Sequence, residues 1–390
     1  SMRRNPVKVL IATFVILIGI VVPARAGNPN CNETDGDYIV SFTFGKNVDD
    51  EIKTAPGRAI SASFKYSTAV NGFAASLTAE QVCAFKKRPG TRVEKDATVQ
   101  AVGKPGSGSG GSGSVDWYSW GLDRVDQPQL PLNTSFNRTT NGSGVTAYII
   151  DTGIYAAHSQ FGGRVQKGFS SVKDGRGTDD CNGHGTHVSG TVGGTDSGVA
   201  NAVSLVPVRV LNCQGTGTWS GVIAGLDWVA RDAVGKKAVA NMSLGGGASQ
   251  TVDDAVRKVI TAGVTVAVAA GNSNTDACSS SPARVTEAIT VGAIDSSDNR
   301  ASYSNFGPCV DIYAPGSSIK SAWIGGTSAQ NTISGTSMAT PHVAGIVARY
   351  LGANASTTPA SAQSALITGG KISSVSGLLV SCLTGTGECK

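Results

Sequence analysis

The chain has 390 residues, enough for one large domain and a small one, and it is rich in glycine (51 residues) with 15% charged residues. Its formal net charge of +5 is spread along the sequence, and no lysine- or arginine-rich block is interleaved with aromatic residues, which excludes a typical nucleic-acid-binding protein. The eight cysteines form no CxxC pair, so disulfides in an oxidising compartment are favoured over a zinc site.

Residues 1–26 have the pattern of a secretory signal peptide. A basic start precedes the apolar run 9–22, and Ala24-Arg25-Ala26 gives a small-x-small cleavage site. The apolar run is short for a membrane span and Pro23 interrupts it. We therefore expect a secreted, extracellular protein that is free of the membrane after signal cleavage. The alternative, an uncleaved signal anchor, would be decided by N-terminal sequencing.

Residues 27–103 are predicted to form a small α+β domain of their own. Alternating apolar residues predict strands, and a capping pattern predicts a helix that begins after Thr78. Cys31 and Cys83 are the only thiols in this stretch and are expected to pair. The predicted strands are 38–42, 69–77 and 91–99. Residues 104–116 then form a Gly/Ser-rich linker that cannot build a core.

From residue 117 onward, apolar strand patterns alternate with helical ones. The helical pattern is clearest at 222–230 and 252–260, where apolar residues line one face. This alternation predicts an α/β fold with a doubly wound, mostly parallel sheet and helices on both faces. Functional sites in such sheets lie beyond the carboxyl ends of the strands. The predicted buried strands are 145–150, 204–211, 238–242, 264–270, 288–294 and 310–313.

Asp151-Thr152-Gly153 directly follows the first of these strands. The same tripeptide occurs in aspartic proteases, which need two such carboxylates, but the chain has no second copy. A homodimer could supply the pair, although the parallel-sheet pattern is wrong for that class. The other alternative is a structural turn aspartate.

Two histidines follow in the stretch 182–190. His184 stands at a predicted helix start and His187 lies one turn further. The HxxH spacing allows a metal pair, but the chain has four histidines in all and no carboxylate-rich partner helix. The other interpretation makes His184 a catalytic base and His187 a buried structural residue.

The stretch 335–342 reads as a tight turn that opens a helix. Ser337 would lie at the positive end of the helix dipole beside unpaired backbone N–H groups, a setting that suits a nucleophile next to an oxyanion. A helix N-cap is the alternative role for Ser337, and the two roles are compatible.

In this order, the Asp, His and Ser motifs resemble those of subtilisin-like serine peptidases of the proteinase K group, nearest to the aqualysin-like branch. Residues 149–153, 183–190 and 334–345 carry the resemblance, together with 241–246 and 269–272, and it covers about 117–380. It implies that residues 117–390 form a subtilisin-like catalytic domain. The implied triad is Asp151, His184 and Ser337, with Asn272 as an oxyanion donor.

The resemblance also implies how substrate binds. A peptide would add as a β-strand along the edge of the cleft, and glycine-lined, uncharged walls would accept aromatic or aliphatic side chains with broad specificity. The expected partners are therefore protein and peptide substrates. The implied substrate-binding residues are Gly215, Thr216, Gly217, Ser243, Leu244, Gly245, Gly246, Ala270 and Gly271.

Residues 27–103 resemble the inhibitor-type propeptide of this family, which acts as an intramolecular chaperone and blocks the active site until it is removed. The resemblance therefore implies an autoprocessed zymogen that is cut within about residues 100–116. Sequence alone allows 15 pairings of the six cysteines in the catalytic part. The resemblance implies Cys181–Cys213 and Cys278–Cys309, which leaves Cys382 with Cys389.

Structural calcium is also implied by the resemblance, through hard oxygen ligands. The main site would use Asp311 with the carbonyls of Thr286 and Ala288, and a second would use Asp123, Asp126 and Gln127. The sequence thus predicts a secreted, monomeric, calcium-stabilised serine endopeptidase. The alternative is a catalytically silent secreted binding protein that keeps the fold, and the intact set of catalytic motifs argues against it.

Overall fold

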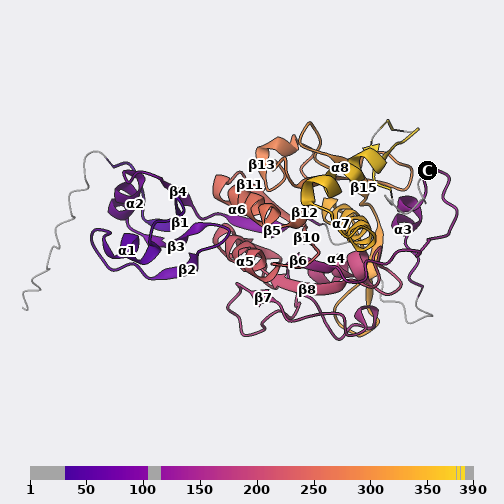
Figure 1. The fold of residues 1–390 in the computed structure, drawn as a ribbon, viewed down its shortest axis with the longest axis horizontal. Coiled ribbons are helices and arrows are strands. Elements are labelled where there is room, and N and C mark those ends of the chain that lie inside the picture. The colour runs from indigo at the N-terminus through magenta and orange to yellow at the C-terminus, as the bar shows by residue number, and fades with distance from the viewer. Residues whose placement is uncertain (1–30, 104–115, 375, 378, 383–390) are drawn as a thin grey trace, which may run out of the picture.

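The computed structural model describes residues 31–103, 116–374, 376–377 and 379–382. The ribbon divides into a small domain at the N-terminal side and a large domain that contains the rest of the chain (Figure 1). The predicted signal peptide, most of the predicted linker and Cys389 lie outside the described residues. In the part of the chain that is described, no helix combines the length and the apolar character needed to span a bilayer.

The small domain is a four-stranded antiparallel sheet, in the order β2-β3-β1-β4, with two helices. Phe42, Phe73 and Phe85 meet in its core, where both helices pack. A capping box at Thr78 opens the second helix, because its side chain accepts from the Gln81 N–H. The elements are β1 (Gly36–Phe42), α1 (Val48–Lys53), β2 (Ala62–Tyr66), β3 (Asn71–Leu77), α2 (Ala79–Lys86) and β4 (Thr91–Lys95).

The large domain is built on a nine-stranded sheet in the order β18-β19-β15-β14-β12-β10-β6-β8-β7. All neighbours pair in parallel except β18 and β19, and all six predicted buried strands belong to this sheet. The strands are β6 (Thr146–Asp151), β7 (Phe169–Ser170), β8 (Ser204–Arg209), β10 (Ala238–Met242), β12 (Val264–Ala269), β14 (Ile289–Ile294), β15 (Ile312–Pro315), β18 (Lys371–Ile372) and β19 (Leu379–Val380).

Side chains of this sheet alternate between two hydrophobic cores, one on each face. In β6, Ala147 and Ile149 join the core with α4 (His184–Gly193) and α7 (Thr336–Ala353). Tyr148 and Ile150 point the other way, to α5 (Trp219–Asp232) and α6 (Gln250–Thr261). The predicted doubly wound α/β sheet is therefore confirmed. The remaining helices are α3 (Trp120–Val125), α8 (Pro359–Gly369) and the 3-10 turns η1 (Ser159–Phe161) and η2 (Ala277–Ser279).

A second, smaller sheet joins the two domains. Strand β5 (Thr98–Ala101), at the end of the small domain, lies between β9 (Thr216–Thr218) and β11 (Leu244–Gly247) and is antiparallel to both. β13 (Ser280–Ser281) completes this sheet on the far side of β11, and β16 (Ile319–Ala322) and β17 (Gln330–Ile333) form a separate hairpin. In Figure 1 β5 runs from the small domain into the middle of the large one.

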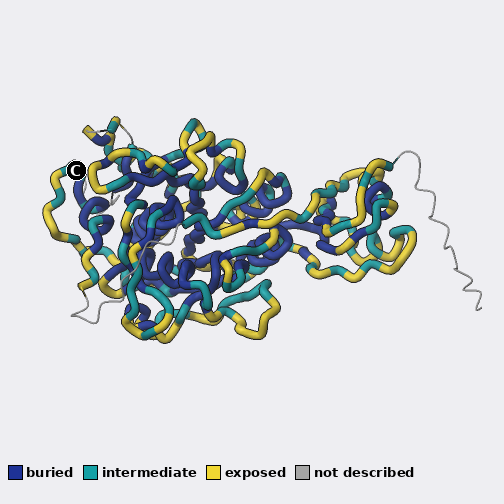
Figure 2. Tube along the Cα trace, turned by 180° about the vertical axis from the view of Figure 1, so that it is seen from behind, coloured by how far each residue is buried: buried dark blue, intermediate teal, exposed yellow. Residues whose placement is uncertain are grey.

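The outer face of the small sheet also packs on the large domain. Ile39, Tyr66 and Ala74 belong to the same core as residues of α5 and α6. Figure 2 shows buried residues continuing from the large domain into the small one, while exposed residues follow the outer loops. The two domains therefore share one hydrophobic interface.

Disulfides join three pairs among the described cysteines. Cys31–Cys83 ties the N-terminal end of the described chain to α2, and Cys181–Cys213 and Cys278–Cys309 close loops of the large domain. Cys382 is buried, and its predicted partner lies outside the described residues.

Candidate active site

The site lies where β6 ends and two helices begin. Asp151 is the last residue of β6, and its two carboxylate oxygens lie 2.8 and 2.9 Å from Nδ1 of His184, the first residue of α4. Asp151 is fully buried. Burial disfavours the charged imidazole, but Asp151 outweighs it, so the pKa of His184 is raised above its usual value. The pair therefore fixes the ring with Nδ1 as donor and Nε2 as acceptor.

Glycines let α4 start close to β6. Gly183 has φ 105°, and a Cβ there would lie 2.5 Å from the Trp323 ring. A Cβ on Gly185 would lie 2.2 Å from the carbonyl oxygen of Gly153. The first turn of the helix can therefore come this close to the end of β6 only because residue 185 is a glycine.

Asp180 is a site residue that the sequence analysis missed. Its buried carboxylate accepts from the backbone N–H of Asn182, Gly183 and Thr186 and from two threonine hydroxyls, one of which is that of Thr152 beside the triad aspartate. Burial raises the pKa of Asp180 above its usual value. Since these donors come from the residue after β6 and from the segment that leads into the first turn of α4, Asp180 positions the start of α4.

Ser337 is the second residue of α7 and is fully buried. Its hydroxyl donates to the carbonyl oxygen of Ser243 at 2.9 Å, and the Ser243 hydroxyl donates back to the Ser337 carbonyl at 2.9 Å. His184 Nε2 is buried and has no hydrogen-bond partner among the described residues. Gly103 lies against it, because a Cβ on that glycine would be 3.2 Å from Nε2.

A peptide carbonyl faces the start of α7. The Ser337 N–H donates to the Val102 carbonyl oxygen at 3.2 Å. Asn272 Oδ1 accepts from both the N–H and the hydroxyl of Thr336, each at 2.9 Å, so its Nδ2 points the other way. A Cβ on Gly335 would lie 2.6 Å from the Val102 oxygen and 3.0 Å from Asn272 Nδ2. The Ser337 N–H thus donates to this carbonyl, and the Asn272 amide lies on the same side of Gly335, an arrangement that resembles an oxyanion hole.

The predicted substrate-binding residues line β5 on both sides. Gln100 pairs with Thr216 and with Gly245, and the Ala101 N–H donates to the Gly215 carbonyl at 2.9 Å. The Val102 N–H donates to the Ser243 carbonyl at 3.2 Å. Beside Val102, a pocket of about 400 Å³ contains Gly245, Gly246, Ala270 and Gly271 and has no charged side chain in its lining.

His187 has a different environment from that of His184. Its Nε2 lies 2.9 and 3.1 Å from the carbonyl oxygens of Ile319 and Asn331, and burial lowers the pKa of His187 to about 3. Among the described residues, Asp174, Cys181 and Cys213 are the one group of three or more His, Cys, Asp or Glu side chains whose ligand atoms lie close enough for a metal, and the two cysteines are joined in a disulfide. The HxxH pair is not part of this group.

The residues of the main predicted calcium site come together before β14 and β15. The Thr290 N–H donates to Asp311 Oδ2 at 2.7 Å, and burial raises the pKa of Asp311 to about 6. The carbonyls of Thr286 and Ala288 both face the side-chain amide of Gln363 on α8.

The second predicted calcium site lies at the end of α3 and in the segment that follows it. The Asp123 carboxylate accepts from the Tyr118 hydroxyl and from the N–H groups of Asn133 and Thr134. Gln127 Nε2 donates to two carbonyls, while its Oε1 is buried and meets no donor in the described chain. Asp126 accepts from the Asn137 N–H at 2.8 Å.

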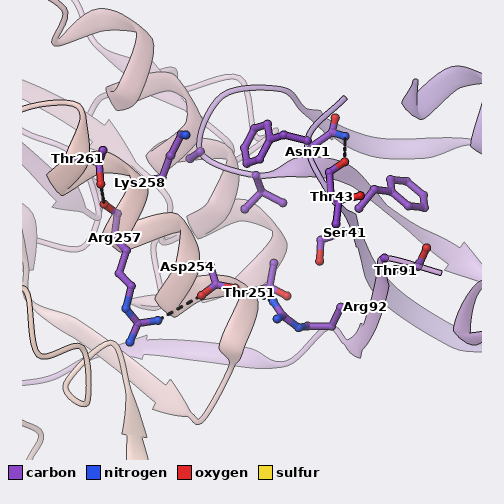
Figure 3. A pocket seen from close by; sticks show the side chains of 15 residues that line it. Ser41, Thr43, Asn71, Thr91, Arg92, Thr251, Asp254, Arg257, Lys258 and Thr261 are labelled. Atoms are coloured by element: carbon purple, nitrogen blue, oxygen red, sulfur yellow. Dashed lines mark hydrogen bonds and ion pairs between the residues drawn. The ribbon is translucent and has the colours of Figure 1, made fainter. Parts of the chain in front are cut away.

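Another pocket, of about 690 Å³, lies away from the triad between the small domain and α6 (Figure 3). Arg92 of the small domain pairs with Asp254 of α6 across it, and Arg257 pairs with the same carboxylate. The Arg92–Asp254 pair thus joins the two domains, while the Arg257–Asp254 pair lies within α6.

The comparisons with known proteins all find subtilases or serine proteases. The Subtilase family model matches residues 142–378. An extracellular serine proteinase of a Thermus strain is 52% identical over 77% of this chain and 71% of its own length. Alkaline serine exoprotease A of Vibrio alginolyticus is 48% identical over 77% of this chain, which spans about half (55%) of that relative. A crystal structure of a cold-adapted subtilisin-like serine proteinase matches with a TM-score of 0.65 and 53% identity, over 68% of this chain and 97% of its own.

Proposed function

The chain belongs to the subtilase family, and we propose that it is a secreted serine endopeptidase that hydrolyses peptide bonds in proteins. One observation carries the proposal: β5 lies in the cleft like a bound peptide, and its continuation offers the Val102 carbonyl to the Ser337 N–H. The His184–Asp151 pair stands beside that carbonyl. The extracellular proteinases among the relatives support both secretion and activity.

In this mechanism Ser337 Oγ attacks the substrate carbonyl carbon while His184 Nε2 accepts the hydroxyl proton. The hydroxyl first turns about the Cα–Cβ bond, away from the Ser243 carbonyl that it now contacts, toward Nε2. Asp151 holds the ring in the required tautomer and stabilises the imidazolium. His184 then gives the proton to the leaving amine, and water releases the acyl group by the same steps in reverse.

Charge on the carbonyl oxygen is stabilised by the Ser337 N–H and by Asn272 Nδ2. Thr336 supports this role, because its N–H and hydroxyl both hold Asn272 Oδ1 and so keep Nδ2 directed at the oxyanion. The triad residues and Asn272 all come from one chain, so we also propose that the enzyme acts as a monomer.

Substrate specificity would be broad. The substrate chain would pair with β9 and β11 through backbone hydrogen bonds, as β5 does, and these bonds do not depend on sequence. The roomy pocket beside Val102 is lined by glycine, alanine and neutral polar residues. Such a lining favours an aromatic or aliphatic side chain without demanding one.

The small domain, residues 27–103, would be an inhibitor-type propeptide. Its β5 fills the cleft, and the Val102–Gly103 bond lies between Ser337 and His184, so we propose this bond as the autocleavage site. Wild-type protein should yield a released small domain that ends at Val102, which mass spectrometry of the separated fragments would detect. A released fragment with any other C-terminus would contradict the assignment. The Ser337→Ala variant should remain one uncut chain.

Structural calcium is proposed at the two sites described above. Asp311 is a desolvated carboxylate beside two converging carbonyls, which is the donor set that calcium prefers. At the second site the buried Gln127 Oε1, which lacks a donor in the described chain, supports a cation as its partner. Calcium bound there would crosslink chain segments and take no part in the hydrolysis.

The proposal is tested by activity together with labelling. Processed protein should digest casein, and a serine-directed phosphonate should block digestion and attach to Ser337. Lack of cleavage after the propeptide is removed, or labelling elsewhere, would favour the silent binding protein instead. An intact signal sequence on protein recovered from the producing cells would favour the membrane-anchored alternative.

A further inference from the structure

Gln363 occupies an unusual position on α8. Its Nε2 donates to the carbonyl oxygen of Thr286 at 3.1 Å and to that of Ala288 at 2.9 Å. One amide nitrogen carries two hydrogens, so both are used on these two carbonyls. The two oxygens therefore converge on a single point, which the side chain of Gln363 holds from a helix more than seventy residues further along the chain.

The same point lies next to a carboxylate. Ala288 directly precedes β14, and Asp311 directly precedes the neighbouring strand β15. Asp311 is tied to the start of β14 by two bonds, since it accepts from the Thr290 N–H and donates its own N–H to the Thr290 carbonyl. Among the described residues, Asp311 forms no salt bridge with a lysine or arginine. Its carboxylate is thus anchored at Thr290, two residues along the chain from Ala288, while Gln363 is the neutral side chain that faces the two carbonyls.

The side-chain amide of Gln363 can present either a nitrogen or an oxygen at this position. Nε2 cannot bind a cation, because its lone pair is delocalised and its hydrogens repel positive charge. A half-turn about the Cγ–Cδ bond replaces Nε2 with Oε1 at nearly the same place. Neighbouring oxygens around calcium, at about 2.4 Å from the ion and 72–90° apart, lie about 2.8–3.4 Å from one another. The distances of 3.1 and 2.9 Å fall in that range.

We propose that Gln363 is a two-state member of this cation site. Without the ion, its NH₂ group bridges the Thr286 and Ala288 carbonyls and holds them together. With the ion, the amide turns and Oε1 becomes a ligand. Gln363 thereby links α8 to the start of β14 in both states. The inference rests on the proposed calcium site at Asp311.

The test uses the full chain carrying Ser337→Ala, so that proteolysis does not interfere. Gln363→Leu removes both functions of the amide, and Gln363→Glu replaces it with a ligand of similar shape that cannot donate. Ser364→Ala, an exposed neighbour on the same helix, is the matched control. Asp311→Asn tests the calcium site itself. Calorimetric titration with CaCl₂ gives the number of sites and each Kd, and thermal unfolding is followed in EGTA and in excess calcium.

For Gln363→Leu we expect the Kd of the Asp311 site to rise about tenfold, as for the loss of one neutral ligand worth about 1.4 kcal/mol. For Gln363→Glu the Kd should fall at least fivefold, while the unfolding temperature in EGTA also falls. This opposite response with and without calcium separates a ligand from a packing residue, which would shift both conditions in the same direction. Ser364→Ala should change neither quantity.

The outcomes separate the two proposals. If Asp311→Asn removes one calcium site but both Gln363 variants keep the wild-type Kd within twofold, the role of Gln363 as a ligand is wrong and the calcium site stands. If the unfolding temperature in EGTA is the same for wild type and Gln363→Leu, the bridging role is wrong. If Asp311→Asn leaves the number and Kd of the sites unchanged, the calcium site at Asp311 is itself wrong.

Discussion

Asp227 on α5 is the residue whose removal should loosen the two domains most. Its buried carboxylate accepts from the N–H groups of Ser67, Thr68 and Ala69 at 3.3, 2.7 and 2.7 Å, and it also pairs with Arg231. A hydrogen bond to a charged group contributes about 1.5–3 kcal/mol, and three that share one acceptor contribute less than their sum. Since the N–H groups are hydrated once the domains separate, we take about 2–4 kcal/mol for the loss in binding free energy of the small domain that Asp227→Ala causes. That loss corresponds to a Kd for the small domain that is about 30- to 1,000-fold higher.

The assay follows the autoprocessed complex, in which the two fragments are held together without a covalent bond. Its dissociation is measured as the concentration at which peptidase activity appears on dilution. Arg231→Ala is the control, because it removes the half-exposed partner of Asp227 and leaves the three N–H bonds in place. Because Arg231 is half exposed, solvent weakens the pair and we take about 0–1 kcal/mol for it, so less than a tenfold change is expected.

The reasoning would be refuted by an Asp227→Ala complex that dissociates within threefold of wild type. It would also be refuted by equal effects of the two variants, since the ion pair and not the backbone N–H groups would then be the important contact. Unfolding of the released large domain should be nearly unchanged in both variants, which shows that the interface and not the fold has been altered.

Three further predictions address the catalytic domain. Asn272→Ala should lower kcat by about 10²–10³ with little change in KM, measured on a peptide substrate, because one of two oxyanion donors is lost; an unchanged kcat would exclude the role. His184 must be neutral to act as a base and its pKa is raised above 6.5, so kcat/KM should fall as the pH drops through a midpoint above 6.5; a midpoint below that value would contradict the direction. Replacing Cys181 and Cys213 together by serine opens a loop with a sequence separation of 32 and should lower the free energy of unfolding by about 3–4 kcal/mol, measured by denaturant titration against wild type.

The sheet of the large domain could be predicted because its strands are buried on both faces. Runs such as 238–242 and 264–269 are buried along their whole length and are apolar except for Asn241 and Thr265, and the helices between them have an apolar face. In the small domain, β2 was not predicted. Its sequence does alternate, with Ala62, Phe64 and Tyr66 between Ser63 and Lys65, but the alternation covers only five residues and was overlooked.

The proposed catalytic residues could be picked out from the sequence because each lies in a short local motif at a strand end or a helix start. Asp180 could not, although it contacts the same elements. Its donors come from Thr152 on one side and from the segment 182–186 on the other, and only the folded chain brings them around one carboxylate. Gln363 was missed for the same reason, because its partners are backbone carbonyls that leave no mark in the sequence.

Contacts between the domains also indicate how the large domain would stay folded after the proposed release of the small one. Glu94 accepts from the N–H groups of Gln250 and Thr251 at the start of α6, and Asp96 accepts from the Ser220 N–H at the start of α5. Both helices nevertheless have their own N-caps, because Thr218 accepts from the Gly221 N–H and Ser249 from the Val252 N–H. The small domain thus provides acceptors for first-turn N–H groups that the N-cap side chains do not bond. Water can take its place as the acceptor for these groups. Its carboxylates therefore contribute to holding the complex together, while the helices depend on residues that the large domain keeps.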